Sequence, residues 1–88
     1  AVGTGGNRDA VERTLEITEL RSYFDIVITA NDVDNFKPHP ETFLRCAEMM
    51  KIEPQHIEVF EDGELGLEAA KRAGMIATDV RSWYDSNW

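Results

Sequence analysis

The sequence predicts an α/β protein in which short parallel strands alternate with helices. Short apolar runs rich in β-branched residues recur along the chain, flanked by glycine or polar residues. Such runs suit strands that are covered on both faces of a parallel sheet. The stretches between them carry apolar residues at helical spacing, and this alternation is typical of βαβ units in an open parallel sheet.

The amino-terminal half is expected to contain a strand, a helix and a second strand. The first strand is a stub at Ala1–Thr4, and a helix follows from Asn7 to Leu20, with Asn7 or Asp9 as its N-cap. The second strand is expected at Asp25–Ala30. Folded domains rarely begin halfway along a buried strand, so either the first strand is very short or the chain starts inside a larger protein.

The carboxyl-terminal half repeats the alternation. A helix at Pro40–Met50 has a proline in its first turn, where proline costs little, and a strand follows at Ile57–Phe60. The next helix, Glu64–Ala73, is expected to stop at Gly74 and to lead into a weaker strand at Met75–Val80. The apolar stripe of the first of these helices is expected to comprise Phe43, Leu44, Ala47 and Met50.

Length and composition exclude several classes of protein. A chain of 88 residues holds one domain, and 42% hydrophobic residues are too many for a disordered chain. Its apolar runs are too short to span a membrane. With 9 Lys+Arg against 17 Asp+Glu, the net charge of −8 argues against a nucleic-acid partner. The single Cys46 cannot form an internal disulfide, and no secretory signal opens the chain, so we expect a cytoplasmic protein.

The first candidate site is the segment that follows the first strand. Ligands of open α/β sheets bind at the carboxyl ends of the strands, where Thr4-Gly5-Gly6-Asn7 is expected to lie. The glycines let backbone N–H groups approach a ligand, and the helix N-terminus behind them favours an anion. The alternative interpretation is a plain turn between a strand and a helix.

The second candidate site is a lysine in a stiff loop. Pro38 and Pro40 force an extended path on the segment after Lys37. A lysine with reduced freedom is a point charge that suits a phosphate; the alternative, which is the more common case for a lone lysine, is a solvated surface side chain. His39 in the same loop is expected to be exposed and not catalytic.

The third candidate site is a pair of adjacent carboxylates at the end of a strand. Glu61 and Asp62 repel each other unless a positive charge lies nearby, and a hard cation such as Mg²⁺ is the usual partner. The alternative is that Asp62 caps the next helix while Glu61 points to solvent.

Taken together and in this order, these motifs resemble a known family. Thr4 comes first, then the run from Lys37 to Phe43 in the pattern Lys-Pro-x-Pro-x-x-Phe, and last Glu-Asp-x-x-x-Gly-x-x-Ala-Ala-x-x-Ala-Gly over 61–74. This is similar to the haloacid dehalogenase (HAD) superfamily, in its β-phosphoglucomutase-like branch, and is closest to small sugar-phosphate phosphatases, including those for fructose 1-phosphate. The resemblance covers residues 1–81 as the carboxyl-terminal portion of a HAD-like core domain, and leaves 82–88 as a tail.

The resemblance implies a role for each candidate residue. The Thr4 hydroxyl and the Gly5 backbone N–H would hold the transferring phosphoryl group, and Lys37 would neutralise charge between phosphate and nucleophile. Asp62 would ligate Mg²⁺, and Glu61 would hold the metal through water. These roles suit phosphoryl transfer, which depends on positioning and on charge neutralisation.

Two parts of the family pattern are missing from these residues. The Asp-x-Asp motif, which carries the nucleophile and the general acid/base on a central strand, would lie upstream, as would the cap that selects the substrate. The resemblance therefore implies part of a Rossmann-like, three-layer α/β/α parallel sheet without its central strand, so that two strand pairs with open inner edges remain. We expect this chain alone to be inactive, and its partners to be the missing amino-terminal part and a phosphorylated sugar.

Other functions stay open at this stage. The resemblance does not separate a phosphatase that works through an aspartyl phosphate from a β-phosphoglucomutase, because the two differ mainly in the cap and in the acid/base residues. The missing nucleophile also leaves a non-catalytic fragment or interaction module as a function of another class.

Overall fold

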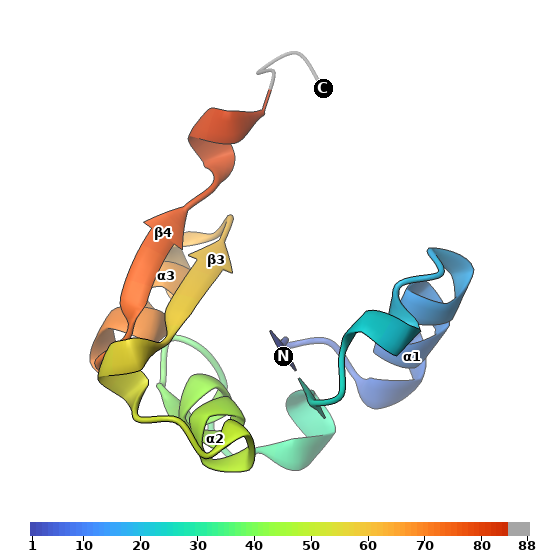
Figure 1. The fold of residues 1–88 in the computed structure, drawn as a ribbon, viewed down its shortest axis with the longest axis horizontal. Coiled ribbons are helices and arrows are strands. Elements are labelled where there is room, and N and C mark those ends of the chain that lie inside the picture. Colours follow the sequence, from blue (N-terminus) through green and yellow to red (C-terminus); the bar gives the residue numbers. More distant parts are fainter. Residues whose placement is uncertain (85–88) are drawn as a thin grey trace.

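The computed structural model describes residues 1–84 of the chain, and the helices and strands alternate there as the sequence predicts (Figure 1). The chain order is β1 (Val2–Gly3), α1 (Arg8–Ile17), β2 (Val27–Ile28), α2 (Glu41–Met50), β3 (Glu58–Glu61), α3 (Glu64–Arg72) and β4 (Ile76–Asp79). Short 3₁₀ turns lie at Arg21–Tyr23, Ala30–Asp32, Pro54–His56 and Arg81–Trp83. Within residues 1–84, no helix is long and apolar enough to cross a membrane.

The strands of the described residues form two separate parallel pairs. β1 pairs with β2, with Val2 opposite Val27, and β3 pairs with β4, with Glu58 opposite Ile76. In each pair the intervening helix, α1 or α3, connects two parallel neighbours, so each pair is a βαβ unit. This confirms the predicted α/β class with parallel strands and the two predicted strand pairs.

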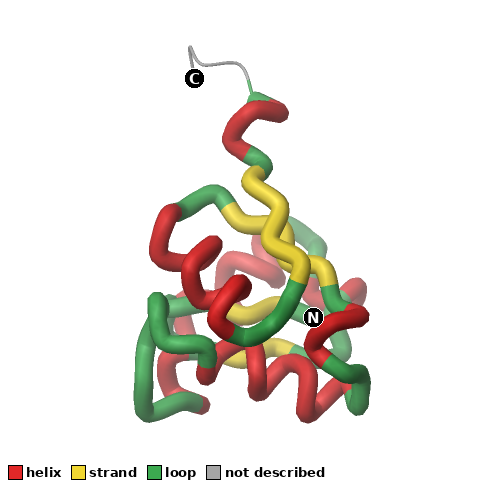
Figure 2. Tube along the Cα trace, turned by 90° about the vertical axis from the view of Figure 1, so that its left-hand side faces the viewer, coloured by secondary structure: helices red, strands yellow, loops and turns green. Residues whose placement is uncertain are grey.

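Helix α2 joins the two βαβ units. It packs against β1 and β2 on one side and against α3 on the other, and Figure 1 shows it between the two arms of the molecule. The side view in Figure 2 shows the two strand pairs at different levels of the structure. The core cluster lies where α2 meets α3 and β4, and its buried members are Phe43, Ala47, Ala69, Ala70, Ala73 and Met75.

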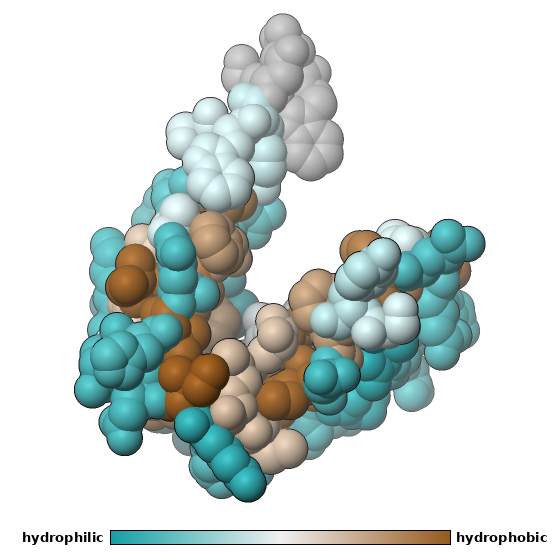
Figure 3. All heavy atoms as spheres, viewed as in Figure 1, coloured by the Kyte–Doolittle hydropathy of each residue, from teal (hydrophilic) through white to brown (hydrophobic). Residues whose placement is uncertain are grey.

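A groove of about 420 Å³ separates β1 from β3. Its lining includes Val2, Phe43, Ile57, Val59 and Met75, so its walls are largely apolar. Figure 3 shows apolar side chains gathered on this concave face between the two arms. Because β1 and β3 are each paired on one side only, their other backbone edges are unpaired within residues 1–84.

Element ends differ from the sequence predictions at a few positions. β2 stops at Ile28 because Thr29 caps a 3₁₀ turn: its hydroxyl accepts from Asn31 N–H, and Asp32 accepts from Thr29 N–H. α1 ends at Ile17, and Glu19 has a φ of 61°, so the predicted extension to Leu20 is wrong.

The carboxyl-terminal half matches its prediction more closely. α3 ends at Arg72 and Gly74 adopts a φ of 80°, the left-handed conformation that favours glycine after a helix. On α2, Leu44 is 39% exposed and does not belong to the buried stripe, whereas Cys46 does. The predicted tail, 82–88, begins inside the Arg81–Trp83 turn, and 85–88 lie outside the described residues.

Candidate active site

Lys37 connects three elements at the carboxyl ends of β1 and β3. Its ammonium donates to Glu61 Oε2 at 3.0 Å and to the Gly3 carbonyl oxygen at 3.2 Å. It also lies 4.7 Å from the centroid of the Phe43 ring, which a cation stabilises through its π face. The side chain is 17% exposed, so the alternative of a solvated surface lysine is wrong.

The loop that carries Lys37 is fastened to the start of α2 by a carboxylate. Glu41 accepts hydrogen bonds from the backbone N–H groups of Asp34 and Asn35 and from the Asn35 amide. The N–H bond from Asp34 is the main cause that lowers the pKa of Glu41 below its ordinary value. His39 is exposed, as predicted, and its Nδ1 accepts from Glu41 N–H at 3.1 Å.

Glu61 at the end of β3 is the charge partner of Lys37. Its side chain is only 16% exposed, so the alternative in which it points to solvent is wrong. Burial opposes its ionisation, but the hydrogen bond and charge of Lys37 outweigh burial, with help from Asp62 N–H, and keep the pKa of Glu61 below its ordinary value. The Glu61 carboxylate is therefore ionised at neutral pH.

Asp62 lies next in the chain and faces solvent. The N-cap of α3 is Gly63, without a side-chain cap, so the alternative in which Asp62 caps this helix is wrong. Burial, followed by the neighbouring Asp62 carboxylate, raises the pKa of the Tyr84 hydroxyl. Within residues 1–84 no group of three His, Cys, Asp or Glu side chains could hold a metal ion. The described residues thus offer two adjacent carboxylates but no complete metal site.

Thr4 and Gly5 form the turn between β1 and α1. Thr4 N–H donates to the Ile28 carbonyl, and the Thr4 hydroxyl oxygen accepts from Gly6 N–H at 3.1 Å. Gly5 is exposed, and a Cβ built on it would have no neighbour within 4 Å. Asn7 is the N-cap of α1, as predicted. The turn therefore presents open backbone in front of a helix N-terminus.

The structure brings some of the predicted residues together and leaves others apart. Lys37 contacts Glu61 directly and reaches Thr4 only through the adjacent Gly3 carbonyl. No hydrogen bond or ion pair joins Lys37 to Asp62 among the described residues. Sequence reasoning missed Phe43 beneath the ammonium, although Phe43 closes the motif that begins at Lys37.

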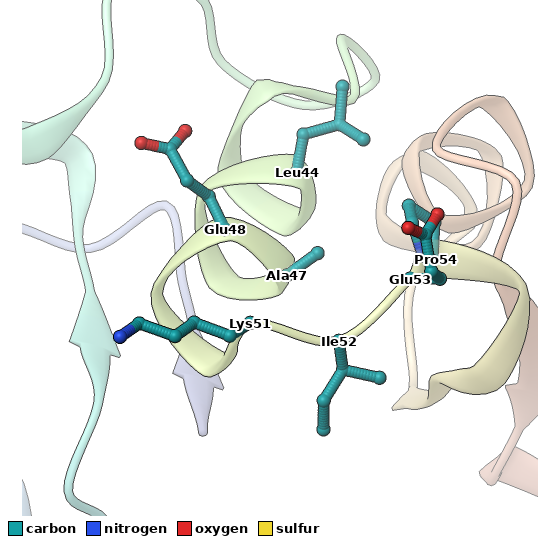
Figure 4. Close-up of a pocket in the computed structure, with 7 residues that line it drawn as sticks. All are labelled: Leu44, Ala47, Glu48, Lys51, Ile52, Glu53 and Pro54. Carbon is teal, nitrogen blue, oxygen red and sulfur yellow. The ribbon is translucent and has the colours of Figure 1, made fainter.

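A second depression, at the carboxyl end of α2, has no group of converging polar side chains like that around Lys37. It holds about 410 Å³ beside the carboxyl end of α2 and is lined by Leu44, Ala47, Glu48, Lys51, Ile52, Glu53 and Pro54. Figure 4 shows Lys51, Ile52 and Glu48 pointing in different directions. Because its polar groups do not converge on one point, the candidate active site remains the group around Lys37.

The comparison with protein families gives one match that spans nearly the whole chain. The family described as "Haloacid dehalogenase-like hydrolase" matches residues 1–80.

Individual proteins are similar over the same region. The fructose-1-phosphate phosphatase of Escherichia coli K12 is 48% identical over 81 residues, which is 92% of this chain and 43% of that protein. A phosphorylated carbohydrates phosphatase of Thermotoga maritima is 43% identical over 68 residues, 77% of this chain and 31% of that protein.

A solved structure shares the fold. The crystal structure of a β-phosphoglucomutase from Clostridium difficile superposes with a TM-score of 0.73 at 31% identity, over 76% of this chain and 30% of that one. The chain thus spans about two fifths of the length of the curated relatives that it matches first.

Proposed function

The chain belongs to the haloacid dehalogenase-like hydrolase family, and on that premise we propose that it is the carboxyl-terminal part of a Mg²⁺-dependent phosphatase for a small sugar phosphate. Two relatives are named as phosphatases of fructose 1-phosphate and of phosphorylated carbohydrates. The reaction would proceed through an aspartyl phosphate on an aspartate that lies outside these residues. We call the chain with that amino-terminal part the full-length protein.

The observation that carries the proposal is the position of Lys37. Its ammonium lies between β1 and β3, held by the Gly3 carbonyl and by Glu61. A phosphate bound at the Thr4-Gly5 turn would meet backbone N–H groups, the Thr4 hydroxyl and this fixed positive charge. Such a set stabilises negative charge on the equatorial oxygens, which is most of the work of phosphoryl transfer.

Asp62 and Glu61 are the residues that would hold Mg²⁺. Carboxylate oxygens are the ligands that this cation prefers, and Asp62 faces solvent. Two adjacent acids provide part of a site, so the remaining ligands would come from the amino-terminal part and from water. When bound, the metal would neutralise charge on the phosphoryl oxygens.

The amino-terminal part is proposed as the physical partner of this chain. The groove between β1 and β3 has apolar walls and an unpaired backbone edge on each side within residues 1–84. A strand seated there would satisfy both edges and bury these walls. The protein would act in the cytoplasm, where a reducing milieu suits the buried free Cys46.

A β-phosphoglucomutase is the second candidate function, favoured by the fold shared with a named mutase. A non-catalytic fragment or interaction module is the third, because the family's nucleophile motif, which lies on a strand upstream of β1, is not among these residues.

One assay separates these functions. Purified full-length protein is incubated with fructose 1-phosphate and other hexose phosphates, with Mg²⁺ or with EDTA, and both free phosphate and isomerised sugar phosphate are measured. A phosphatase releases phosphate, and EDTA stops the release. Isomerisation without release would identify a mutase, and no turnover of either kind would leave an interaction module.

A further inference from the structure

Helix α3 has a glycine at a position where its backbone does not require one. Gly66 is the third residue of Glu64–Arg72 and is buried. Among the described glycines only Gly74 has a positive φ, so Gly66 has a backbone conformation that alanine adopts easily. Since alanine is favoured over glycine inside a helix, the reason for this glycine is sought in the space around it.

That space is occupied by the Glu61 side chain. A Cβ built on Gly66 would overlap with Oε2, Cδ and Cγ of Glu61, far inside van der Waals contact, and these are its three nearest neighbours. The overlap involves the same oxygen, Oε2, that accepts from Lys37 at 3.0 Å.

The neighbouring glycine gives a contrast. A Cβ on Gly63, in the same turn, would have Glu61 Oε1 as its only neighbour within 4 Å, at an ordinary contact distance of 3.9 Å. The tight approach is therefore particular to Gly66 and is not a general property of the loop.

We propose that Gly66 is a positioning residue: the absence of a side chain there lodges the Glu61 carboxylate where it holds the Lys37 ammonium against the Gly3 carbonyl. Any side chain at this position turns Glu61 out and removes the anchor of Lys37, whose side chain is 17% exposed. The steric part stands on the structure alone. The consequence for phosphate binding rests on the proposed function.

The first test is a thermal-stability cycle in the full-length protein, with the variants Gly66→Ala, Glu61→Ala and the double variant. With Glu61 present, Gly66→Ala should lower Tm by about 3–10 °C, because the added methyl group turns Glu61 out and breaks its charge-assisted bond to Lys37. In the Glu61→Ala background the overlapping atoms are gone, so the same change should raise Tm by about 2–3 °C, as expected for alanine in a helix. Gly63→Ala is the matched control: because Gly63 is the N-cap of α3, the change should lower Tm by about 1–5 °C, by the same amount with and without the Glu61 side chain.

The second test measures the binding of inorganic phosphate by calorimetry. Gly66→Ala should weaken binding about fivefold, because the freed Lys37 must be ordered again by the ligand. Gly63→Ala should stay within about twofold, and the double variant should bind as Glu61→Ala does. A merely structural role of Gly66 would not make its effect on affinity depend on Glu61.

The outcomes are distinct. An equal loss of Tm in both backgrounds, or a double variant that fails to fold while Glu61→Ala folds, would overturn the proposal. A rise in Tm for Gly66→Ala with Glu61 present would do the same. If no variant binds phosphate, the proposed function fails, while the stability cycle still decides whether Gly66 positions Glu61.

Discussion

The Lys37 ammonium has an unusual set of neighbours for a lysine in a loop. A carbonyl oxygen, a carboxylate oxygen and an aromatic face surround it, each from a different element. Together these contacts restrict a side chain that would otherwise move freely. A charge that is already fixed needs little reorganisation when a phosphate arrives.

Lys37 is expected to contribute more to turnover than Thr4. Lys37→Ala removes a charge-assisted contact to phosphate and should lower kcat/KM of the full-length protein by about 10–150-fold. Thr4→Ala removes one neutral hydrogen bond beside a backbone donor and should cost about 2–12-fold. Lys71→Ala, at an exposed position on α3, is the control and should leave kcat/KM unchanged. Equal losses for Lys37 and Thr4 at saturating Mg²⁺ would refute the ranking.

The second prediction concerns Asp62. Asp62→Asn removes one negative charge from the proposed metal site while keeping its shape, so it should raise the Mg²⁺ concentration at half-maximal activity. The measurement is a Mg²⁺ titration of phosphate release. Asp34→Asn, at another exposed acid, is the control. A metal requirement that stays at the wild-type value would show that Asp62 is not a ligand.

The sequence predicts which residues of the site carry chemistry, but it does not predict which of them contact one another. The Lys37 and Glu61-Asp62 motifs mark chemistry by type and order, but the Lys37–Glu61 contact joins residues 24 positions apart. Such a contact depends on how α2 places its loop beside β3, and no local pattern encodes that placement. The sequence motif therefore predicts a role of Glu61 toward the metal but does not identify Lys37 as its partner.

The stability of the loop before α2 is expected to depend on pH. Bonds from the loop lower the pKa of Glu41 below the ordinary 4.5, so its stabilising contribution is complete above pH 4.5 and is lost as pH falls through the lower folded value. Glu41→Gln should thus lower Tm of the full-length protein above pH 4.5, and the difference from wild type should shrink in more acidic solution.

The control for this experiment is Glu48→Gln on the same helix. The Glu48 carboxylate is exposed and lies 4.0 Å from the Arg45 guanidinium. The Tm of this variant should differ little from that of wild type, both above pH 4.5 and in more acidic solution. If Glu41→Gln lowers Tm by the same amount above pH 4.5 and in more acidic solution, the charge of the Glu41 carboxylate does not stabilise the loop.

Helix α2 is expected to depend on Phe43. This ring is 5% exposed, belongs to the core cluster and lies beneath Lys37. Phe43→Ala should therefore destabilise the full-length protein by about 3–5 kcal/mol in urea unfolding. Phe36→Ala is the matched control, because Phe36 is 59% exposed and its removal should change stability by no more than about 0.5 kcal/mol. Similar losses for both would place Phe43 outside the core.

The elements were predictable in kind and order, and less so in length. Periodicity and caps identified each helix, including the Asn7 cap and the Gly74 stop. The predicted second strand is longer than β2, because Thr29 and Asp32 form a reciprocal cap that ends the strand after Ile28. The signal, a threonine three residues before an acid, was present in the sequence, but the apolar run around it favoured a strand.

Residues 1–88 alone are expected to fold poorly and to release no phosphate. The inner edges of β1 and β3 are unpaired within the described part, and each lost hydrogen bond costs about 0.5–1.5 kcal/mol. A few such losses rival the total stability of a small domain, about 5–15 kcal/mol. Thermal unfolding followed by circular dichroism should therefore show a broad, non-cooperative transition.

Mixing with the amino-terminal part provides the complementary measurement. Mixing should sharpen the thermal unfolding transition and restore phosphatase activity. Sedimentation measurements should show less aggregated protein. A cooperative transition of the isolated monomer would contradict this expectation, and phosphate release by the isolated chain would overturn it.

The contacts of Lys37 also bear on how this protein can change over generations. One ammonium touches Gly3 in the first βαβ unit and Glu61 in the second, two units that share no sheet in the described residues. A substitution anywhere that shifts one unit against the other also moves the charge that would meet the phosphate. Natural selection for turnover would then also preserve the alignment of the two βαβ units. Substitutions in the core would be tolerated only where they leave the position of Lys37 unchanged.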